Sequence, residues 1–236
     1  SDIYFHYPKS DDYSIQKLNL VIERNTTVGL VGPTGSGKTT IVDIVLGLLR
    51  PNFGELVVND IVVTPDNVKG WQQCIGYVPQ QIYLFDDTIA KNIAFGVQDK
   101  DIDHVALERA ARIANLHNYI VNEMPNGYET IVGQRGLRLS GGQQQRIGIA
   151  RALYHKPDIL VLDEATSALD GVTENVVMDA IRLMSHKLTI IMVAHRLNTV
   201  KNCDVIHYID QGRIISSGTY ADLSESCRHF KEMVEA

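Results

Sequence analysis

The hydrophobic positions in the first quarter of the chain predict strands followed by a helix. Residues 3–7 and 18–22 have strand-like patterns, and the connection between them is too short for a parallel crossover, so we expect an antiparallel pair. Residues 27–31 form another short apolar run. Residues 41–49 are apolar over a length that suits a helix better than a strand. This part of the chain therefore predicts strand, loop and helix in succession.

A hairpin and a helical region follow. Residues 55–58 and 62–63 are strand-like, and the polar pair Asn59-Asp60 between them predicts a tight turn. Residues 75–79 predict one more short strand. From residue 88 to about residue 122 the spacing of apolar residues becomes helical and strand signals are missing. We therefore expect a helical subdomain inserted after the first strands.

The second half of the chain predicts the centre of a parallel sheet. Residues 159–162 and 188–193 are nearly continuous apolar runs, as expected for strands that are buried on both faces. The predicted fold class is α/β with a mostly parallel core sheet and an antiparallel part near the N-terminus. The other predicted elements are a helix that begins at Ser140, a helix at about 172–184, strands at 205–209 and 213–216, and terminal helical sequence.

A glycine-rich loop separates the run at 27–31 from the helix that follows it. The loop reads G-x-x-x-x-G-K-T, and strand, glycine loop and helix is the order that a phosphate-binding loop requires. Glycines let backbone N–H groups approach a phosphate, and the helix N-terminus adds donors and a favourable dipole. The lysine suits the β- and γ-phosphates and the threonine hydroxyl suits Mg²⁺; a chance match in a turn is the alternative. The candidate nucleotide-binding residues are Gly32, Pro33, Thr34, Gly35, Ser36, Gly37, Lys38, Thr39 and Thr40.

Composition and charge narrow the classes of protein. The apolar content of 44% permits a buried core, and the net charge of −6 argues against a nucleic-acid-binding surface. Cys74, Cys203 and Cys227 have neither disulfide nor metal spacing, which favours a reducing, cytoplasmic setting. We find no signal-peptide pattern and no apolar run near the ~20 residues that span a bilayer.

Two acidic residues and a histidine follow the two buried strands. Ligands of parallel sheets bind beyond the carboxyl ends of the strands, so we expect Asp163 and Glu164 near the glycine loop. Asp163 suits the Mg²⁺ shell, directly or through water, and Glu164 could orient and deprotonate an attacking water. His195 could hydrogen-bond a γ-phosphate oxygen. The alternatives are an acidic helix start stabilised by the dipole, and a histidine that caps or packs.

A second glycine-rich stretch, Leu139-Ser140-Gly141-Gly142-Gln143, also precedes a predicted helix. A serine at the N-cap, bare backbone N–H groups and a helix dipole would together bind an anion. A flexible helix start is the alternative. A compact domain rarely keeps two phosphate sites for one ligand, and the sequence pattern by itself does not tell whose phosphates this stretch binds.

Together these motifs resemble the nucleotide-binding domain of an ATP-binding-cassette (ABC) transporter over essentially the whole chain. Six motifs occur in the order that the family has. They are the phosphate loop at 32–39, the glutamine loop at Gln80, the signature at 139–143, the acidic strand at 159–163 with Glu164 after it, the D-loop at 167–170, and the switch histidine His195.

The resemblance implies roles for further residues. Tyr7 matches the aromatic that stacks on adenine, with a packed core aromatic as the alternative. Gln80 matches the residue that reaches Mg²⁺ and the attacking water, although Gln81 beside it offers a second register. The signature would bind the γ-phosphate held by a second subunit, which implies a head-to-tail dimer with two shared ATP sites. Asp170 would contact the opposing loop in that dimer.

Details within the family point to the exporter type. Residues 84–96 and 130–136 resemble the exporter segments that follow the glutamine loop and precede the signature. Gln134 stands where exporters usually have Glu, which removes a charge expected to face the coupling helices of the membrane domain. In exporters this domain is normally the C-terminal part of a longer chain. The nearest resemblance, through residues 77–85, is to bacterial lipid-linked oligosaccharide flippases.

The resemblance therefore implies an ABC ATP-binding domain over residues 1–236, with a catalytic core at 1–85 and 155–236 and a helical subdomain at 86–154. We expect Mg²⁺-dependent ATP hydrolysis through Glu164, His195, Gln80 and Lys38, with Thr39, Gln80 and Asp163 toward the metal. The expected partners are ATP, a second copy and a transmembrane domain, at the cytoplasmic face of a bacterial inner membrane, with a possibly lipid-linked substrate.

Three other classes of protein carry a similar loop. A soluble ABC ATPase of DNA repair or translation would need a coiled-coil insertion, a zinc module or a second cassette, for which we find no pattern. An importer ATPase subunit does not match the exporter-like segment at 130–136 and usually has a regulatory domain. A P-loop kinase would leave the signature without a purpose.

Overall fold

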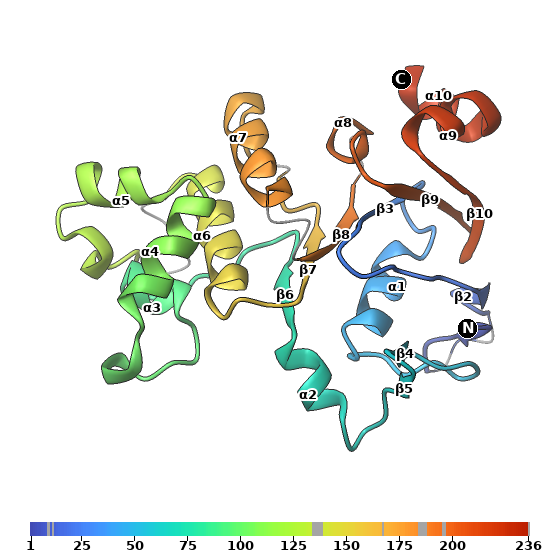
Figure 1. Ribbon diagram of the computed structural model, residues 1–236, viewed down its shortest axis with the longest axis horizontal. Helices are drawn as coiled ribbons and strands as arrows, with labels where there is room; N and C mark the ends of the chain where they lie inside the picture. Colours follow the sequence, from blue (N-terminus) through green and yellow to red (C-terminus); the bar gives the residue numbers. More distant parts are fainter. Residues whose placement is uncertain are drawn as a thin grey trace. The chain divides into compact units, whose positions relative to one another are not determined.

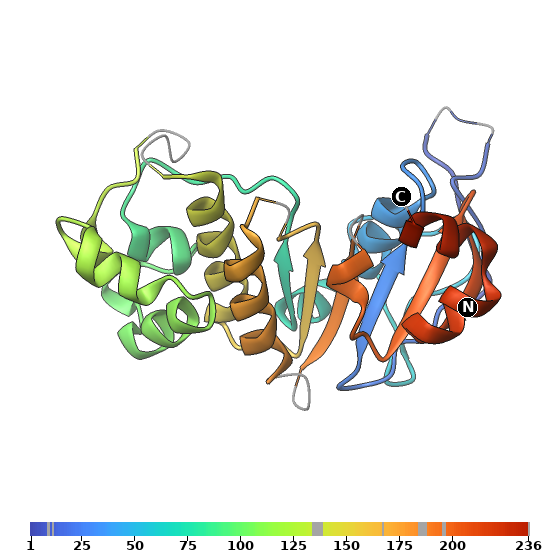
Figure 2. The same ribbon diagram turned by 90° about the horizontal axis from the view of Figure 1, so that it is seen from above.

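The computed structural model describes residues 1–8, 10, 12–133, 139–166, 168–183, 188–194 and 197–235. The chain forms two compact units, of which one comprises Ser1–Ile75 with Thr189–Ala236 and the other Gly76–Leu188. Figures 1 and 2 show the elements of each unit from two directions.

The first unit contains the parallel strands predicted from their continuous apolar runs. Strand β3 (Thr27–Val31) runs parallel to both β8 (Thr189–Val193) and β9 (Val205–Asp210), and every residue of β3 and β8 is buried. Strand β10 (Arg213–Gly218) pairs antiparallel with β9 at the edge. The order in this unit is therefore β10-β9-β3-β8, with β3 between two parallel neighbours.

Helices cover both faces of these strands. Figure 1 shows α1 (Lys38–Val45) on one side of β3 and β9, with α9 (Tyr220–Ser226) and α10 (Arg228–Glu235) on the other side. The short helix α8 (Leu197–Val200) contacts β3. Because β3 leads directly into the glycine loop and then into α1, the loop projects from the carboxyl end of β3.

The antiparallel part of the first unit corrects one prediction and confirms another. Strand β1 (Ile3–Phe5) pairs antiparallel with β2 (Ile15–Leu18), so the strand predicted at 18–22 lies earlier in the chain. The period-2 rule fails in β2 because Ile15 and Leu18 both point inward and Lys17 between them has φ 50°. The predicted hairpin is present as β4 (Val57–Val58) and β5 (Ile61–Val62).

A helix that the sequence pattern did not predict stabilises the end of α1. Helix α2 (Val68–Gln73) has no fully buried residue, so it lacks the apolar stripe by which amphipathic helices are detected. Trp71 donates through Nε1 to the Val45 carbonyl at 2.7 Å, and Gln72 donates to the Leu46 carbonyl at 3.2 Å. These bonds satisfy carbonyl groups that the last turn of α1 leaves without intrahelical partners.

The second unit consists of two strands and the predicted helical region. Strand β6 (Ile75–Val78), which begins at the boundary of the unit, lies beside β7 (Ile159–Asp163). Helix α6 (Gly141–Tyr154) approaches β6 closely, because a Cβ at Gly76 would lie 2.5 Å from the Ala152 carbonyl oxygen. The remaining elements are α3 (Ile89–Ile93), η1 (Asp99–Asp101), α4 (His104–Ile113), α5 (His117–Glu123), η2 (Gly127–Glu129) and α7 (Gly171–Arg182).

Helix α6 is the central element of the helical region. Both α3 and α4 pack against it, and α5 packs against α4 and η2 (Figure 1). Its C-terminal half is buried almost throughout, as expected for a helix surrounded by other helices. Within the part of the chain that the structure describes, no helix combines the length and the apolar character needed to cross a membrane.

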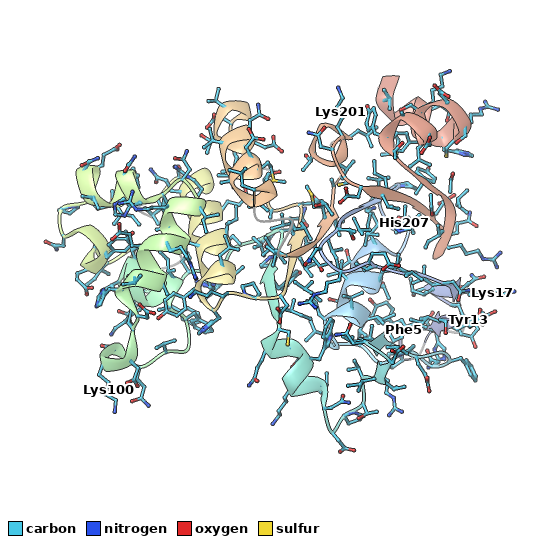
Figure 3. The ribbon with its side chains drawn as sticks, in the orientation of Figure 1. Phe5, Tyr13, Lys17, Lys100, Lys201 and His207 are labelled. Atoms are coloured by element: carbon cyan, nitrogen blue, oxygen red, sulfur yellow. The ribbon has the colours of Figure 1, made fainter. Side chains whose placement is uncertain are left out.

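A buried histidine gives the first unit a pH-dependent stability. His207 lies on β9 (Figure 3), where Nδ1 is 2.7 Å from the exposed Ser217 hydroxyl and Nε2 is buried without a partner among the described residues. Burial lowers the pKa of His207, because the charged imidazolium loses its hydration. As the pH falls below about 6.5, the unfolded chain takes up a proton at this residue that the folded chain does not bind, so the folded state loses stability.

We expect His207→Leu to remove this contribution. Thermal unfolding of the variant and of the wild type, measured from pH 8 to pH 5, should show the melting temperature of the variant rising relative to the wild type below pH 6.5. Ser217 is exposed and can bond water instead, so the variant should fold. A constant difference between the two proteins over this range would show that His207 titrates alike in the folded and unfolded chains.

Candidate active site

The glycine loop between β3 and α1 is built around the ammonium group of Lys38. Lys38 is 5% exposed, and Nζ donates to the carbonyl oxygens of Gly32 at 2.9 Å and Pro33 at 2.8 Å. The Ser36 hydroxyl lies 3.4 Å from the same nitrogen. Thr39, one residue further along α1, is exposed. The loop thus brings a positive charge, the N-terminus of α1 and an exposed threonine to one place, as the sequence predicted.

Backbone conformation explains why glycines occupy this loop. Gly32 has φ 149°, and a Cβ there would lie 2.0 Å from the Ile209 carbonyl oxygen on β9. Gly37, at the N-cap of α1, has φ 102°. Gly35 has φ 78° in open space, so its requirement is conformational rather than steric. The loop therefore depends on glycine for two different physical reasons.

Tyr7 lies beside the helix that follows the glycine loop. Its hydroxyl is 3.2 Å from the Thr40 hydroxyl on α1, and its ring packs edge-on against Phe5 at 5.0 Å between centroids. The residue is nevertheless 41% exposed. One edge of the ring is thus held in place while part of it faces solvent, which leaves a surface on which a flat ligand could stack.

The second unit contains the acidic pair at the end of β7. Asp163 is buried, and the Tyr77 hydroxyl on β6 donates to Oδ2 at 3.4 Å. Gln80 follows β6, and its Nε2 donates to Glu164 Oε2 at 2.8 Å. The structure therefore brings Gln80 and Glu164 together, two residues that the sequence motifs singled out separately. Within the described part of the chain, Gln81 makes no hydrogen bond to Glu164. This difference favours Gln80 over Gln81 as the glutamine of the glutamine loop.

Glu164 has an unusual backbone. Its φ is 50°, in the left-handed region that residues other than glycine, asparagine and aspartate seldom occupy. Such a conformation costs on the order of 1–3 kcal/mol and persists only where surrounding contacts hold it. One of these contacts comes from Gln145 on α6, whose Nε2 donates to the Glu164 carbonyl at 3.3 Å.

The signature stretch forms the N-terminus of α6, as predicted. Ser140 is the N-cap, and its hydroxyl oxygen accepts from the Gln143 backbone N–H at 3.2 Å. The Gln143 side chain accepts from the Ser140 backbone N–H at 2.8 Å, which completes a capping box. Ser140 and Gly141 are exposed. The Ser140 hydroxyl accepts with its oxygen, so its proton can be donated to a ligand.

Asp170 has a structural role within the described chain. It is the N-cap of α7, and its carboxylate accepts from the Thr173 backbone N–H at 3.0 Å. This bond lowers the pKa of Asp170, so the residue stays ionised at neutral pH. Its position is exposed, and its contact with an opposing loop stays a prediction.

Some predicted residues lie outside the part of the chain that the structure describes. They are the switch histidine His195, Ser167 at the start of the D-loop, and Gln134 in the segment before the signature. The structure also adds residues that the motifs did not indicate, namely Tyr77 beside Asp163 and Gln145 beside Glu164. Tyr77 could have been found, because it lies on the strand directly before Gln80. Gln145 is separated from Glu164 by 19 residues, and periodicity does not reveal such a contact.

Comparison with known proteins identifies a family whose sequences match this chain. A family model described as ABC transporter matches residues 15–167. The multidrug resistance protein pgp-1 of Caenorhabditis elegans is 43% identical over 232 residues, which cover 98% of this chain and 18% of that protein. An ATP-dependent lipid A-core flippase of Alkalilimnicola ehrlichii is 38% identical over 231 residues, which cover 98% of this chain and 39% of the flippase.

A solved structure agrees with the sequence comparisons. The structure of a bacterial Atm1-family ABC exporter with ATP bound matches with a TM-score of 0.93 and 35% identity, over 99% of this chain and 40% of that chain. The chain thus spans less than half the length of each of these relatives. Its fold is the P-loop NTPase fold of ABC ATPases, with mostly parallel strands, antiparallel strands and a helical part that carries the signature. This chain belongs to the ABC transporter family.

Proposed function

We propose that the chain is the ATP-binding and ATP-hydrolysing domain of an ABC exporter. The observation that carries the proposal is the geometry of the glycine loop. Lys38 directs its ammonium group to the carbonyl groups of a loop whose glycines have positive φ, at the N-terminus of a helix. Charge, backbone donors and dipole at one point suit the β- and γ-phosphates of a nucleoside triphosphate. Tyr7 supplies the adenine contact through the exposed part of its ring.

Glu164 is the proposed general base. Gln80 Nε2 donates to its carboxylate at 2.8 Å, and a carboxylate held in this way can accept a proton from an attacking water. His195 and Lys38 hold the γ-phosphate in this proposal, His195 on the strength of the family resemblance. The expected donors for Mg²⁺ are the Thr39 hydroxyl, the Asp163 carboxylate and the Gln80 amide oxygen.

This donor set fits magnesium. All three donors are hard oxygen ligands, and Mg²⁺ in nucleotide sites typically takes one or two carboxylates together with phosphate oxygens. When bound, Mg²⁺ would neutralise charge on the phosphates.

The proposal includes a head-to-tail pair of domains. Ser140, Gly141, Gly142 and Gln143 form an exposed helix N-terminus that suits a phosphate, and in the pair they contact the γ-phosphate held by the other copy. Asp170 then lies near the facing loop of that copy. Hydrolysis would remove the charge that joins the two surfaces, so the pair closes with ATP and opens after turnover.

An exposed aromatic cluster supports a membrane-domain partner. The rings of Phe85 and Phe95 are stacked with centroids 4.9 Å apart, and Tyr83 packs edge-on against Phe85 at 5.4 Å. All three side chains are exposed. The Arg151 guanidinium lies 5.3 Å from the centroid of the Phe95 ring, and Nη1 donates to the Tyr83 carbonyl at 3.0 Å. Exposed, fixed aromatic side chains of this kind suit a protein interface.

We propose that this cluster contacts the transmembrane domain of the same or a partner chain. In this proposal the ATP-binding domain lies at the cytoplasmic face of a membrane. The match of 99% of this chain to part of an exporter disfavours the DNA-repair, translation and importer alternatives. The relative named as a lipid A-core flippase is compatible with a lipid-linked substrate for this protein as well. We also retain the proposed division into a catalytic core at 1–85 and 155–236 and a helical subdomain at 86–154.

Product analysis tests the proposed reaction. Purified chain with Mg²⁺ and ATP should release ADP and inorganic phosphate without any acceptor, and removal of Mg²⁺ with EDTA should stop the release. Thin-layer chromatography of labelled ATP separates free phosphate from a phosphorylated product. Label in an acceptor rather than in phosphate would indicate a kinase, and label that stays in ATP under all conditions would contradict an ATPase.

A further inference from the structure

Gln145 is a buried polar residue of α6 and is not among the proposed catalytic or nucleotide-binding residues. Its side chain is 3% exposed. Nε2 donates to the Glu164 carbonyl oxygen at 3.3 Å, and Oε1 accepts from the Ala168 backbone N–H at 2.8 Å. A buried primary amide is stable only when its donor and acceptor are both satisfied, and here the loop after β7 satisfies both.

The two bonds reach the backbone after β7 at two points, Glu164 and Ala168. Glu164 has a φ of 50°, which places it in the left-handed region. The Thr166 carbonyl accepts from the Leu169 N–H at 3.0 Å. A glutamate in the left-handed backbone conformation persists only where other contacts hold it. The bond from Gln145 to the Glu164 carbonyl therefore helps to fix the direction in which the Glu164 side chain leaves the backbone.

The same helix begins with the signature. Gln145 is two residues beyond Gln143, in the first turns of α6. The helix also approaches the loop closely at Gly142, where a Cβ would lie 3.3 Å from the Ala168 carbonyl oxygen. A displacement of the N-terminus of α6 would therefore move the backbone that carries Glu164, because α6 is hydrogen-bonded to that backbone and closely packed against it.

We infer that Gln145 is a positioning residue that ties the signature helix to the catalytic carboxylate of the same chain. The inference rests on the proposed function, in which the signature binds the nucleotide held by a second copy and Glu164 acts on the nucleotide of its own chain. Gln145 then links the two ATP sites of the pair. It contacts no substrate itself and acts through Glu164.

Two substitutions separate the bonds that Gln145 makes. Gln145→Met keeps a similar length and loses both bonds, whereas Gln145→Glu keeps an acceptor for Ala168 and loses the donor to Glu164. We expect each to lower kcat by about 10- to 100-fold, because small displacements of a catalytic group have effects of this size. KM for ATP should stay within about threefold, because the phosphate loop is unchanged. Gln144→Met is the matched control; its amide bonds the Leu139 carbonyl, and kcat should change less than about threefold.

A double-mutant cycle identifies the route of the effect. In the background of Glu164→Gln, adding Gln145→Met should lower the residual turnover by less than about twofold, because the residue through which Gln145 acts has lost its function. Losses that multiply, an unchanged kcat in both Gln145 variants, or an equal loss in Gln144→Met would overturn the inference. If Gln145→Met does not fold, Gln145→Glu carries the same cycle. Full turnover by Glu164→Gln alone would instead refute the proposed general base.

Discussion

Glu164→Gln should leave ATP binding intact and lower turnover by a factor on the order of 10² to 10⁴, which is the usual contribution of a positioned general base. The glutamine has nearly the same shape, and its carbonyl oxygen can still accept the bond that Gln80 Nε2 makes to Glu164 at 2.8 Å. The substitution removes the negative charge and with it the capacity to take a proton from water. A steady-state assay of phosphate release, with ATP binding measured separately, distinguishes these two effects.

The same variant tests the proposed pair of domains. Without hydrolysis the ATP-closed state should accumulate, so Glu164→Gln should elute from gel filtration as a dimer in ATP and as a monomer in its absence. Glu174→Gln is the matched control, because it removes one negative charge from the same unit and a glutamine oxygen can still accept from the Thr166 hydroxyl. Its turnover should stay within about threefold of wild type. A monomer in ATP with unimpaired turnover would remove Glu164 from its role.

Local chemistry explains which parts of the fold could be predicted. The glycine loop, α1 and the hairpin at Asn59-Asp60 are determined by residues within a few positions of one another, and both Asn59 and Asp60 have the positive φ that such a turn requires. The buried strands β3 and β8 were equally visible, since continuous apolar runs indicate burial on both faces. In these elements local preference and tertiary structure agree.

The errors arose where tertiary contacts override the local pattern. Strand β2 was expected three residues later, because a left-handed residue at Lys17 places Ile15 and Leu18 on the same side and breaks the alternation. Helix α2 was missed because its stability comes from hydrogen bonds of Trp71 and Gln72 to the end of α1, more than twenty residues earlier. Neither feature leaves a periodic signal in the sequence.

The candidate site shows the same division. Motifs identified Gln80 and Glu164 separately, but the hydrogen bond between them spans 84 residues and became evident only in the structure. The structure likewise shows Ser140 and Asp170 as helix caps, a role that does not conflict with binding at an exposed helix N-terminus. A motif therefore predicts which residue types occur at a site, whereas the contacts that hold them require the fold.

Gly32→Ala should disrupt both the stability of the first unit and ATP binding. The added Cβ would lie 2.0 Å from the Ile209 carbonyl oxygen, and alanine is strained at φ 149°. Overpacking and backbone strain each cost about 1–3 kcal/mol, so we expect a loss of roughly 2–6 kcal/mol and a fall in melting temperature of roughly 4–24 °C. The loop must move away from β9, which displaces the carbonyl groups that position Lys38, so ATP affinity should fall by at least about tenfold.

Gly70→Ala provides the control for this substitution. Gly70 lies in α2 of the same unit, and a Cβ there meets nothing within 4 Å. Alanine is favoured over glycine inside a helix by about 0.5–1 kcal/mol, so this variant should melt at the same or a slightly higher temperature and bind ATP normally. Differential scanning calorimetry and titration with a fluorescent ATP analogue measure the two effects. Equal behaviour of the two variants would show that the close approach of Gly32 to β9 does not constrain the phosphate loop, and the geometric argument for nucleotide binding at Lys38 would fail with it.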